Sequence, residues 1–326
     1  MSTADVSVHA AVAAEPAPAP APTPEQGDAP LPDGGVVVAL AQLAPRLGDV
    51  PHNLQRHLAV IEEARAGGAH LVVFPELSLT GYFLKDLVPD VALRQDSPEL
   101  ADLARAAETV DVVAGAVLES DDARFHNVAL YFSGGRLHHV HRKVYLPTYG
   151  LFDELRYLAP GDRFRAFDAP LRGAGQRRAW RAGMLVCEDM WHLSAPALLA
   201  RQGVDVVLCP SASPGRGVAG GNALGTARSY DAMTRTYAQL TTSYLLYCNR
   251  VGFEDGVHFW GGSRVVDPEG RVGAEAGDGE QVLWHRLDLA AIRRARLAYP
   301  LLRDERNDVT DSENQRLRTA REDEPA

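Results

Sequence analysis

The sequence predicts an α/β fold in which helices cover mixed β-sheets. Nearly continuous apolar runs, such as VVVALAQL from Val36 and LVVF at residues 71–74, are typical of strands buried on both faces. Segments with helical spacing of apolar residues separate these runs, as expected where helices cover a sheet. The apolar runs at 112–117 and 127–132 are spaced like a hairpin and add antiparallel neighbours. We therefore expect strands of both directions in the sheets.

Each element in turn has its own local signal. Residues 53–67 place Leu54, Leu58 and Ile61 at helical spacing, and the pair Gly67-Gly68 is a helix stop. Apolar runs and helical spacing of apolar residues also predict the later elements. In chain order they are a helix near 97–108, strands at 112–117 and 127–132, a strand or hairpin return at 136–144, a strand at 182–186, a helix at 195–202, a strand at 204–209, a long amphipathic helix at about 222–242, antiparallel strands at 244–249 and 263–267, and a final hairpin ending near Trp284.

The chain divides into three parts by composition. Residues 1–34 contain the Ala/Pro-rich stretch EPAPAPAPTPEQGDAPLP, which cannot bury enough apolar surface to offset the entropy of ordering. We expect a disordered leader there and one folded domain over residues 35–302. Residues 303–326 are charged and nearly free of apolar side chains, so we expect a solvated tail, part of which could lie across a partner subunit.

Charge and cysteine content exclude several classes of partner. The net charge of −10 offers no attraction for nucleic acid or for anionic membrane surfaces. No stretch approaches the roughly 20 apolar residues of a membrane span, and the N-terminal segment lacks a secretory or mitochondrial pattern. The odd number of cysteines, Cys187, Cys209 and Cys248, without close pairing, indicates reduced thiols. We expect a soluble cytoplasmic protein.

Three residues that could do chemistry lie at the ends of predicted strands. Cys187 follows GMLV, Glu76 follows LVVF and a proline, and Lys143 ends the strand around HHVHR. Strand ends are where open α/β sheets place ligand sites, so these side chains could converge. A carboxylate beside an ammonium can take a thiol proton, while the ammonium stabilises an oxyanion. Taken singly, each residue has a plainer interpretation: a packed thiol, a helix-start carboxylate and a solvated strand edge.

The segments around these residues resemble a known family. FPELSLTGY at 74–82, HRKVYLPTYGLFDELRYLAPG at 141–161 and GMLVCEDMW at 183–191 are similar to the Glu, Lys and Cys signature blocks of the nitrilase superfamily of carbon-nitrogen hydrolases. The blocks occur in the family's order, and the similarity runs from about Val36 to about Asp288. Within the superfamily, LPTYGLFDE and CEDMW most resemble the glutaminase domain of glutamine-dependent NAD synthetases.

The resemblance implies a fold and a mechanism. The fold is a four-layer α-β-β-α sandwich that pairs with a second copy into αββα-αββα dimers, so we expect a homo-oligomer. In the implied mechanism Glu76 takes the proton of Cys187, and the thiolate attacks an amide carbonyl. Lys143 and the backbone N–H of Glu188 hold the oxyanion, and water then hydrolyses a thioester. Glu154 matches a second glutamate that these enzymes often place beside the triad.

The resemblance also implies substrate-binding residues. Glu188 and Tyr149 match positions that bind the amino-acid end of the substrate in glutaminase domains, and their plainer interpretations are a turn carboxylate and a half-buried aromatic. Ser213 matches a loop serine near the substrate, and we add Tyr82 to this set. Two departures count against glutamine as substrate and against NAD synthesis by this chain alone: Gly215-Arg216-Gly217 replaces the usual Phe-His stretch, and no SGGxDS pyrophosphate loop is present.

The leading hypothesis is an amidase that hydrolyses a small linear carboxamide, whose amino or carboxylate group Glu188, Tyr149 and Arg216 or Arg228 could bind. The histidines at 126, 138, 139, 141, 192 and 258 fit no zinc motif, so we expect no metal and no cofactor. The alternatives are a glutaminase subunit that feeds ammonia to a separate synthetase, an N-carbamoyl amidohydrolase, an acyltransferase and a nitrile hydrolase. A catalytically silent interaction protein is the non-enzyme alternative, disfavoured by the joint presence of Glu76, Lys143, Cys187 and Glu154.

Overall fold

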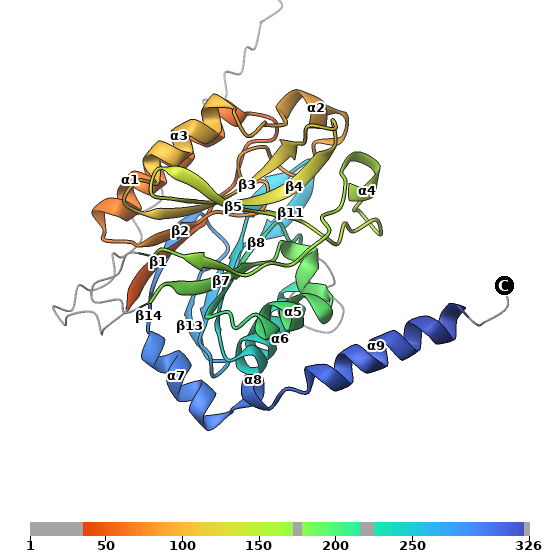
Figure 1. The fold of residues 1–326 in the computed structure, drawn as a ribbon. Coiled ribbons are helices and arrows are strands. Elements are labelled where there is room, and N and C mark those ends of the chain that lie inside the picture. Colours follow the sequence, from red (N-terminus) through yellow and green to blue (C-terminus); the bar gives the residue numbers. More distant parts are fainter. Residues whose placement is uncertain (1–34, 172–177, 216–224, 323–326) are drawn as a thin grey trace, which may run out of the picture.

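The structure is a computed structural model that describes residues 35–171, 178–215 and 225–322. The expected leader at residues 1–34 lies outside the described residues. Two six-stranded mixed sheets form the centre of the molecule (Figure 1). In spatial order, the first sheet contains β14 (Gln281–Leu287), β1 (Val36–Gln42), β2 (Leu71–Val73), β3 (Asp111–Glu119), β4 (Phe125–Ser133) and β5 (Arg136–Arg142). The second contains β13 (Val272–Glu275), β12 (Arg264–Val266), β9 (Tyr244–Asn249), β8 (Val206–Ser211), β7 (Trp180–Met184) and β6 (Phe167–Ala169).

Both sheets are mixed, as the sequence predicts. Strands β1, β2 and β3 run parallel in the first sheet, as do β7, β8 and β9 in the second. The expected antiparallel pairs are also present, because β3 pairs with β4 and β9 pairs with β12. A short separate hairpin, β10 (Val251–Glu254) with β11 (Val257–Trp260), lies between β9 and β12 in the chain and was not predicted.

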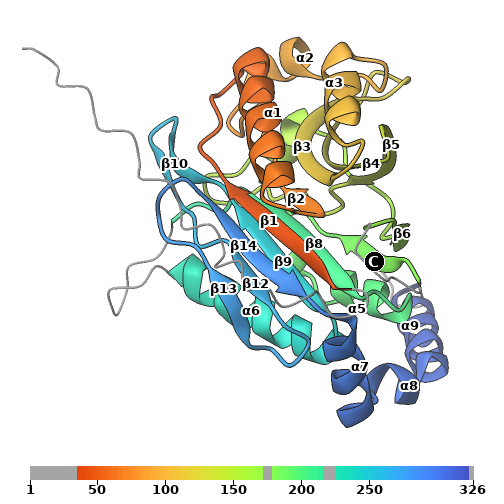
Figure 2. The ribbon, with the colours of Figure 1, turned by 90° about the vertical axis from the view of Figure 1, so that its left-hand side faces the viewer.

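Helices cover the outer faces of the two sheets, which gives the order α-β-β-α (Figures 1 and 2). Helices α1 (Val50–Ala66) and α3 (Pro98–Ala106) lie on the first sheet, and α5 (Ser194–Arg201) and α6 (Gly225–Thr241) lie on the second. Alternate residues of β1 show why the layers form. Val36, Val38 and Leu40 belong to the core between the sheets, while Ala39 and Ala41 belong to the core beneath α1 and α3.

The expected final hairpin is wrong. Strands β13 and β14 lie in different sheets, because β13 pairs with β12 and β14 pairs with β1 over seven residue pairs. The chain between them crosses from one sheet to the other, and the side chain of Gln42 donates to the carbonyl oxygens of Gly277 (2.8 Å) and Gly279 (2.7 Å) along it. Long antiparallel pairing at the open edge of β1 outweighs the short local turn that the sequence suggested.

The C-terminal segment is helical rather than irregular. Helices α7 (Leu289–Ala298) and α8 (Leu301–Asp304) lead to α9 (Asn307–Glu322), which projects from the body of the molecule (Figure 1). The ion pair of Asp311 with Arg201 of α5 ties it to the body. The described side chains of α9 are almost all exposed, and the helix itself was not predicted.

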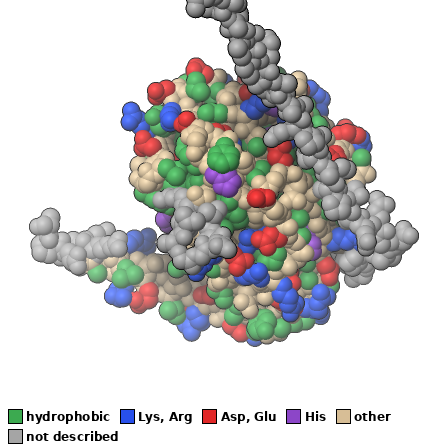
Figure 3. Space-filling model, turned by 180° about the vertical axis from the view of Figure 1, so that it is seen from behind, with side chains coloured by type: hydrophobic (Ala, Val, Ile, Leu, Met, Phe, Trp, Pro, Cys, Tyr) green, Lys and Arg blue, Asp and Glu red, His purple; other side chains and the backbone are tan. Residues whose placement is uncertain are grey.

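Four short elements lie in the loops between the strands and longer helices. They are the 3₁₀ turns η1 (Lys85–Leu87) and η2 (Cys187–Trp191) and the helices α2 (Val88–Val91) and α4 (Glu154–Tyr157). No helix in the described part of the chain is both long enough and apolar enough to cross a bilayer. On the face shown in Figure 3, acidic and basic side chains are interspersed.

Candidate active site

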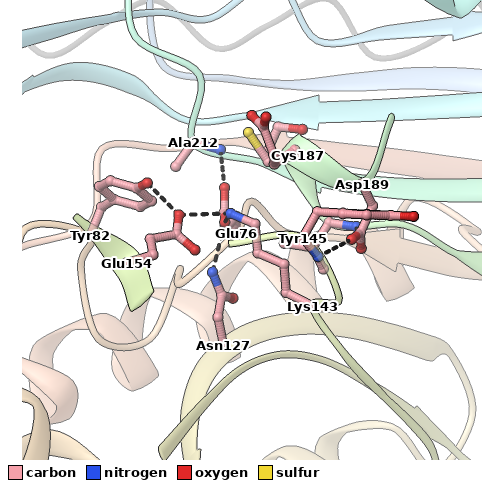
Figure 4. Close-up of polar contacts among 12 residues, drawn as sticks. Glu76, Tyr82, Asn127, Lys143, Tyr145, Glu154, Cys187, Asp189 and Ala212 are labelled. Carbon is pink, nitrogen blue, oxygen red and sulfur yellow. Dashed lines mark hydrogen bonds and ion pairs between the residues drawn. The ribbon is translucent and has the colours of Figure 1, made fainter. Parts of the chain in front are cut away.

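Glu76, Lys143 and Cys187 come together at one end of the two sheets. Glu76 follows β2 and Lys143 follows β5 in the first sheet, whereas Cys187 follows β7 in the second. Because the sheets are stacked, the ends of these strands face one another, and Figure 4 shows the three side chains in one group. The prediction that three strand ends converge is therefore correct in its geometry.

An ion-pair network lies at the centre of the group. The ammonium of Lys143 donates to Oε1 of Glu76 and to Oε1 of Glu154, each at 2.7 Å. All three residues are buried, and Glu76 and Lys143 are each 1% exposed. Among the described residues these two carboxylates accept from two of the three N–H groups of Lys143.

Two further residues hold Glu76 in place. The side-chain amide of Asn127 on β4 donates to Oε1 of Glu76 at 2.7 Å, and the backbone N–H of Ala212 donates to Oε2 at 2.8 Å. The backbone N–H of Lys143 also donates to the carbonyl oxygen of Asn127 at 2.8 Å. Asn127 thus contacts both members of the Glu76–Lys143 pair (Figure 4).

Burial and charge oppose each other across the network. For Lys143, burial lowers the pKa, but Glu154 and Glu76 outweigh it, so the pKa is raised well above its ordinary value and the group is an ammonium. For Glu154, burial raises the pKa to about 7 in spite of Lys143. The hydroxyl of Tyr82 donates to Oε1 of Glu154 at 2.5 Å. One carboxylate of the pair is thus poised to hold a proton near neutral pH.

Cys187 lies at a strained turn. Its φ of +45° is in the left-handed region, which costs a non-glycine residue on the order of 1–3 kcal/mol. Burial raises the pKa of its thiol well above the ordinary value, and Glu76 adds to this effect, whereas Lys143 opposes it. Sγ lies 3.2 Å from the hydroxyl oxygen of Tyr230 on α6. At rest the residue is a neutral thiol that needs a base to become a nucleophile.

Two glycines permit the close approach of the site loops. A Cβ on Gly115 of β3 would lie 2.3 Å from the backbone nitrogen of Leu77 and 2.5 Å from the carbonyl oxygen of Pro75. The segment that carries Glu76 therefore passes over β3 only because residue 115 has no side chain. Gly161 does the same beside Lys143, because its Cβ would lie 2.2 Å from the carbonyl oxygen of Arg142.

A cleft of about 420 Å³ opens onto Cys187. It is lined by Tyr149, Phe152, Cys187, Glu188, Trp191, Ser213, Pro214, Gly225, Thr226, Ser229 and Tyr230. The hydroxyl of Tyr149 donates to both carboxylate oxygens of Glu188, each at 3.0 Å. Burial raises the pKa of Glu188, and the Tyr149 hydroxyl opposes that rise. Among the described lining residues, Glu188 is the one that normally carries a charge.

The other expected substrate-binding residues divide into two groups. Ser213 lines the cleft, and its backbone N–H donates to the side chain of Asn249 at 2.8 Å. Tyr82 does not line the cleft, since its hydroxyl faces Glu154 beside a separate cavity of about 120 Å³. Arg228 is exposed and outside the lining, and Arg216 lies outside the described residues.

The histidines form no ligand set in the described ranges, where no group of three or more His, Cys, Asp or Glu side chains could hold a metal ion. His141 instead contacts Asp189, with Nε2 and Oδ2 2.9 Å apart. All three cysteines are free and buried.

Comparison with known proteins identifies the family of the chain. The family model described as carbon-nitrogen hydrolase matches residues 37–297. The chain belongs to the carbon-nitrogen hydrolase family. This carbon-nitrogen hydrolase is 34% identical over 243 residues to the glutamine-dependent NAD(+) synthetase of Thermotoga maritima, a match covering 72% of this chain and 39% of that protein. It is 32% identical over 276 residues to an (R)-stereoselective amidase of a Pseudomonas species, covering 82% of this chain and 91% of the amidase.

Solved structures support the fold of this carbon-nitrogen hydrolase. A carbon-nitrogen hydrolase from Helicobacter pylori superposes with a TM-score of 0.72 at 25% identity, covering 85% of this chain and 97% of that one. The chain spans about two fifths of the length of the NAD synthetases that it matches. The nitrilase-superfamily resemblance and the α/β fold with mixed sheets are thereby confirmed.

Proposed function

We propose that this protein hydrolyses the C–N bond of a small linear carboxamide through a thioester on Cys187. The observation that carries the proposal is the buried ammonium of Lys143, bonded to Glu76 and Glu154 beside a thiol at a strained turn. Burying two carboxylates and an ammonium is costly, so their presence near a nucleophile favours a chemical role over a structural one.

The reaction proceeds in two halves. Glu76 takes the thiol proton, and the sulfur of Cys187 attacks the amide carbon, which places negative charge on the carbonyl oxygen. The free N–H of Lys143 and the backbone N–H of Glu188 hold that oxygen. The C–N bond then breaks as Glu76 gives its proton to the leaving nitrogen, and ammonia departs.

The second half uses the same groups. Glu76 takes a proton from water, and the resulting hydroxide attacks the thioester carbon. The C–S bond breaks, the carboxylic acid leaves, and the proton returns to the sulfur. Glu154 does not touch the reacting atoms in this scheme; it keeps Lys143 charged and in place, and Tyr82 keeps Glu154 in place.

The cleft favours a substrate with an amino group near the amide. Glu188 carries the one formal charge among the described lining residues, and Tyr149 orients both of its oxygens. A protonated amine would satisfy Glu188, whereas a substrate carboxylate would lie near a like charge. The amidase relative, which matches along 91% of its length, supports an amide as the substrate.

The test is ammonia release by the purified protein. Amino-acid amides, glutamine, asparagine, N-carbamoyl amino acids and short aliphatic amides are compared, with the Cys187→Ala variant as the matched control. Release from amino-acid amides that disappears in the variant supports the proposal. No release from any member of the panel would reject it in favour of an acyltransferase or a silent relative.

A second candidate is a glutaminase that supplies ammonia to a separate synthetase. The similarity to NAD synthetases of several bacteria favours it. Glutamine hydrolysis that rises on addition of an ATP-binding partner that co-purifies with the chain would select this candidate over the free amidase.

We also propose that two copies pair through the layer of α5 and α6. Leu193, Leu198 and Leu240 in or beside these helices are 77%, 41% and 57% exposed, and pairing would remove their apolar surface from water. Sedimentation analysis of the wild type is expected to give a dimer or a larger oligomer, and Leu198→Glu together with Leu240→Glu is expected to give monomers. A monomeric wild type would reject this pairing.

A further inference from the structure

Tyr230 is the one hydroxyl-bearing residue within hydrogen-bond distance of the Cys187 sulfur in the described part of the chain. It lies on α6, in the second helix layer, and its hydroxyl oxygen is 3.2 Å from Sγ. None of the three signature blocks includes Tyr230. From the sequence it would be assigned to the core, because an aromatic residue on an amphipathic helix ordinarily packs there.

The neighbours of Tyr230 fix both its ring and its hydroxyl. The residue is 1% exposed, and its ring packs against those of Tyr247 (centroids 4.7 Å apart) and Trp191 (5.7 Å). The indole N–H of Trp191 points at the Tyr230 oxygen at 3.2 Å. The hydroxyl is therefore held at one position beside the thiol.

These contacts set the direction of one hydrogen bond. An indole N–H can only donate, so the Tyr230 oxygen is the acceptor in its bond with Trp191. Toward the resting thiol of Cys187 the Tyr230 hydroxyl can donate or accept. Once Cys187 has lost its proton, the sulfur can only accept, so Tyr230 is then the donor.

We propose that Tyr230 is a catalytic residue that donates a hydrogen bond to the Cys187 thiolate, and that Trp191 is the positioning residue that holds the Tyr230 oxygen beside the sulfur. The proposal rests on the thioester chemistry proposed above. A buried thiolate loses the stabilisation of water, and a neutral hydroxyl restores part of it without adding a charge.

The same bond acts in both halves of the reaction. When Glu76 takes the thiol proton, the Tyr230 hydroxyl stabilises the negative sulfur that attacks the amide carbon. When the C–S bond of the second tetrahedral species breaks, the sulfur again becomes negative, and the hydroxyl stabilises it as a leaving group. Tyr230 itself stays protonated, because burial raises its pKa well above the ordinary value and the neighbouring Cys187 raises it further.

The test is the pH dependence of alkylation of Cys187 by iodoacetamide, followed by mass spectrometry of the peptide that contains it. Cys209 and Cys248 are 0% exposed, whereas Cys187 is 8% exposed and lines the cleft, so the label reports on Cys187. The compared proteins are the wild type, Tyr230→Phe and Tyr237→Phe. Tyr237 is a buried tyrosine on the same helix and is absent from the cleft lining, so its variant is the matched control.

In Tyr230→Phe we expect the midpoint of the alkylation profile to move to higher pH, and kcat/KM for the amide to fall about 10- to 100-fold, as is typical for one hydrogen bond to a charged group. Tyr237→Phe is expected to match the wild type in both measurements. Trp191→Phe, which frees the hydroxyl to rotate, is expected to move the midpoint in the same direction by a smaller amount.

An unchanged alkylation midpoint in Tyr230→Phe would overturn the proposal, even if activity fell, because a packing role alone would not alter the titration of the thiol. Wild-type Cys187 that no pH renders reactive would overturn it as well. If Tyr230→Phe does not fold, a fluorotyrosine at position 230 replaces it; its more acidic hydroxyl is a stronger donor and is expected to lower the midpoint. Alkylation needs no amide, so a Tyr230-dependent midpoint without ammonia release would reject the amidase while supporting the hydrogen bond from Tyr230 to the thiolate.

Discussion

The carboxylate of Asp189 lies 2.9 Å from Nε2 of His141, and both side chains are buried. The other carboxylate oxygen accepts hydrogen bonds from the backbone N–H groups of Val144 and Tyr145, each at 3.0 Å. Asp189 belongs to the turn that begins with Cys187, whereas its partners flank Lys143. This single carboxylate therefore fixes the segment that carries the thiol relative to the segment that carries the ammonium.

Asp189→Asn is expected to lower both stability and activity. The backbone N–H of Val186 also donates to the Asp189 carboxylate, at 2.9 Å. An amide has one acceptor oxygen, so the asparagine side chain cannot accept from the donors on both sides of the carboxylate. We expect the free energy of unfolding to fall by about 1–3 kcal/mol in denaturant titrations, and kcat/KM to fall with it. Asp168→Asn is the matched control, because the Asp168 side chain is 72% exposed and its ion pair with Arg181 is expected to contribute little. Equal effects of the two variants would show that Asp189 does not join the segments.

Glu154→Gln is expected to change how stability depends on pH. The folded-state pKa of Glu154 is raised from 4.5 to about 7, so the folded protein holds this proton more tightly than the unfolded chain does. The stabilisation is complete below pH 4.5 and is lost as the pH rises through 7, by up to roughly 3 kcal/mol. The wild type should therefore lose unfolding free energy relative to Glu154→Gln over this interval. A difference that stays constant between pH 4 and 8 would argue that folding does not raise the pKa of Glu154.

Gly115→Ala is expected to displace Glu76 and abolish activity. The added Cβ would lie 2.3 Å from the backbone nitrogen of Leu77, and a backbone atom cannot yield as the end of a flexible side chain can. The control is Gly279→Ala, since a Cβ on Gly279 meets nothing within 4 Å. Steady-state kinetics and thermal unfolding of the two variants check this prediction. A fully active Gly115→Ala protein would mean that the loop carrying Glu76 is free to shift.

Glu188→Gln is expected to separate two classes of substrate. If Glu188 binds a protonated amine, its neutral replacement should raise KM for amino-acid amides about 10-fold or more. Short aliphatic amides lack that amine, so their kinetic constants in the same variant serve as the internal control. An equal rise in KM for both substrate classes would indicate that Glu188 maintains the structure of the cleft and does not bind the amine.

The sequence predicts much of the candidate site because its main residues lie at strand ends. Glu76 and Cys187 follow recognisable apolar runs, which were located well except at their boundaries, whereas Lys143 follows the mostly polar strand β5. The expected strand at 182–186, for example, is Trp180–Met184 in the structure, and Cys187 opens a 3₁₀ turn. Glu154 was found through its signature block, and its contact with Lys143 needs the folded loop.

The rest of the site was not accessible from one sequence. Ala212 contributes a backbone N–H, which no residue type signals, and Tyr230 has the pattern of a core residue on α6. Asn127 had a weak signal, as a buried amide at the start of an apolar strand. The crossing of β14 to the first sheet depends on long-range pairing with β1, which local turn patterns do not encode.

The most direct test of the central claim is intact-mass analysis of the protein quenched during turnover of an amide. The account predicts a wild-type species heavier by one acyl group, with the acyl group mapped to the Cys187 peptide, and no such species or ammonia release in Cys187→Ala. Ammonia release that continues in Cys187→Ala without any acylated protein would contradict the thioester mechanism.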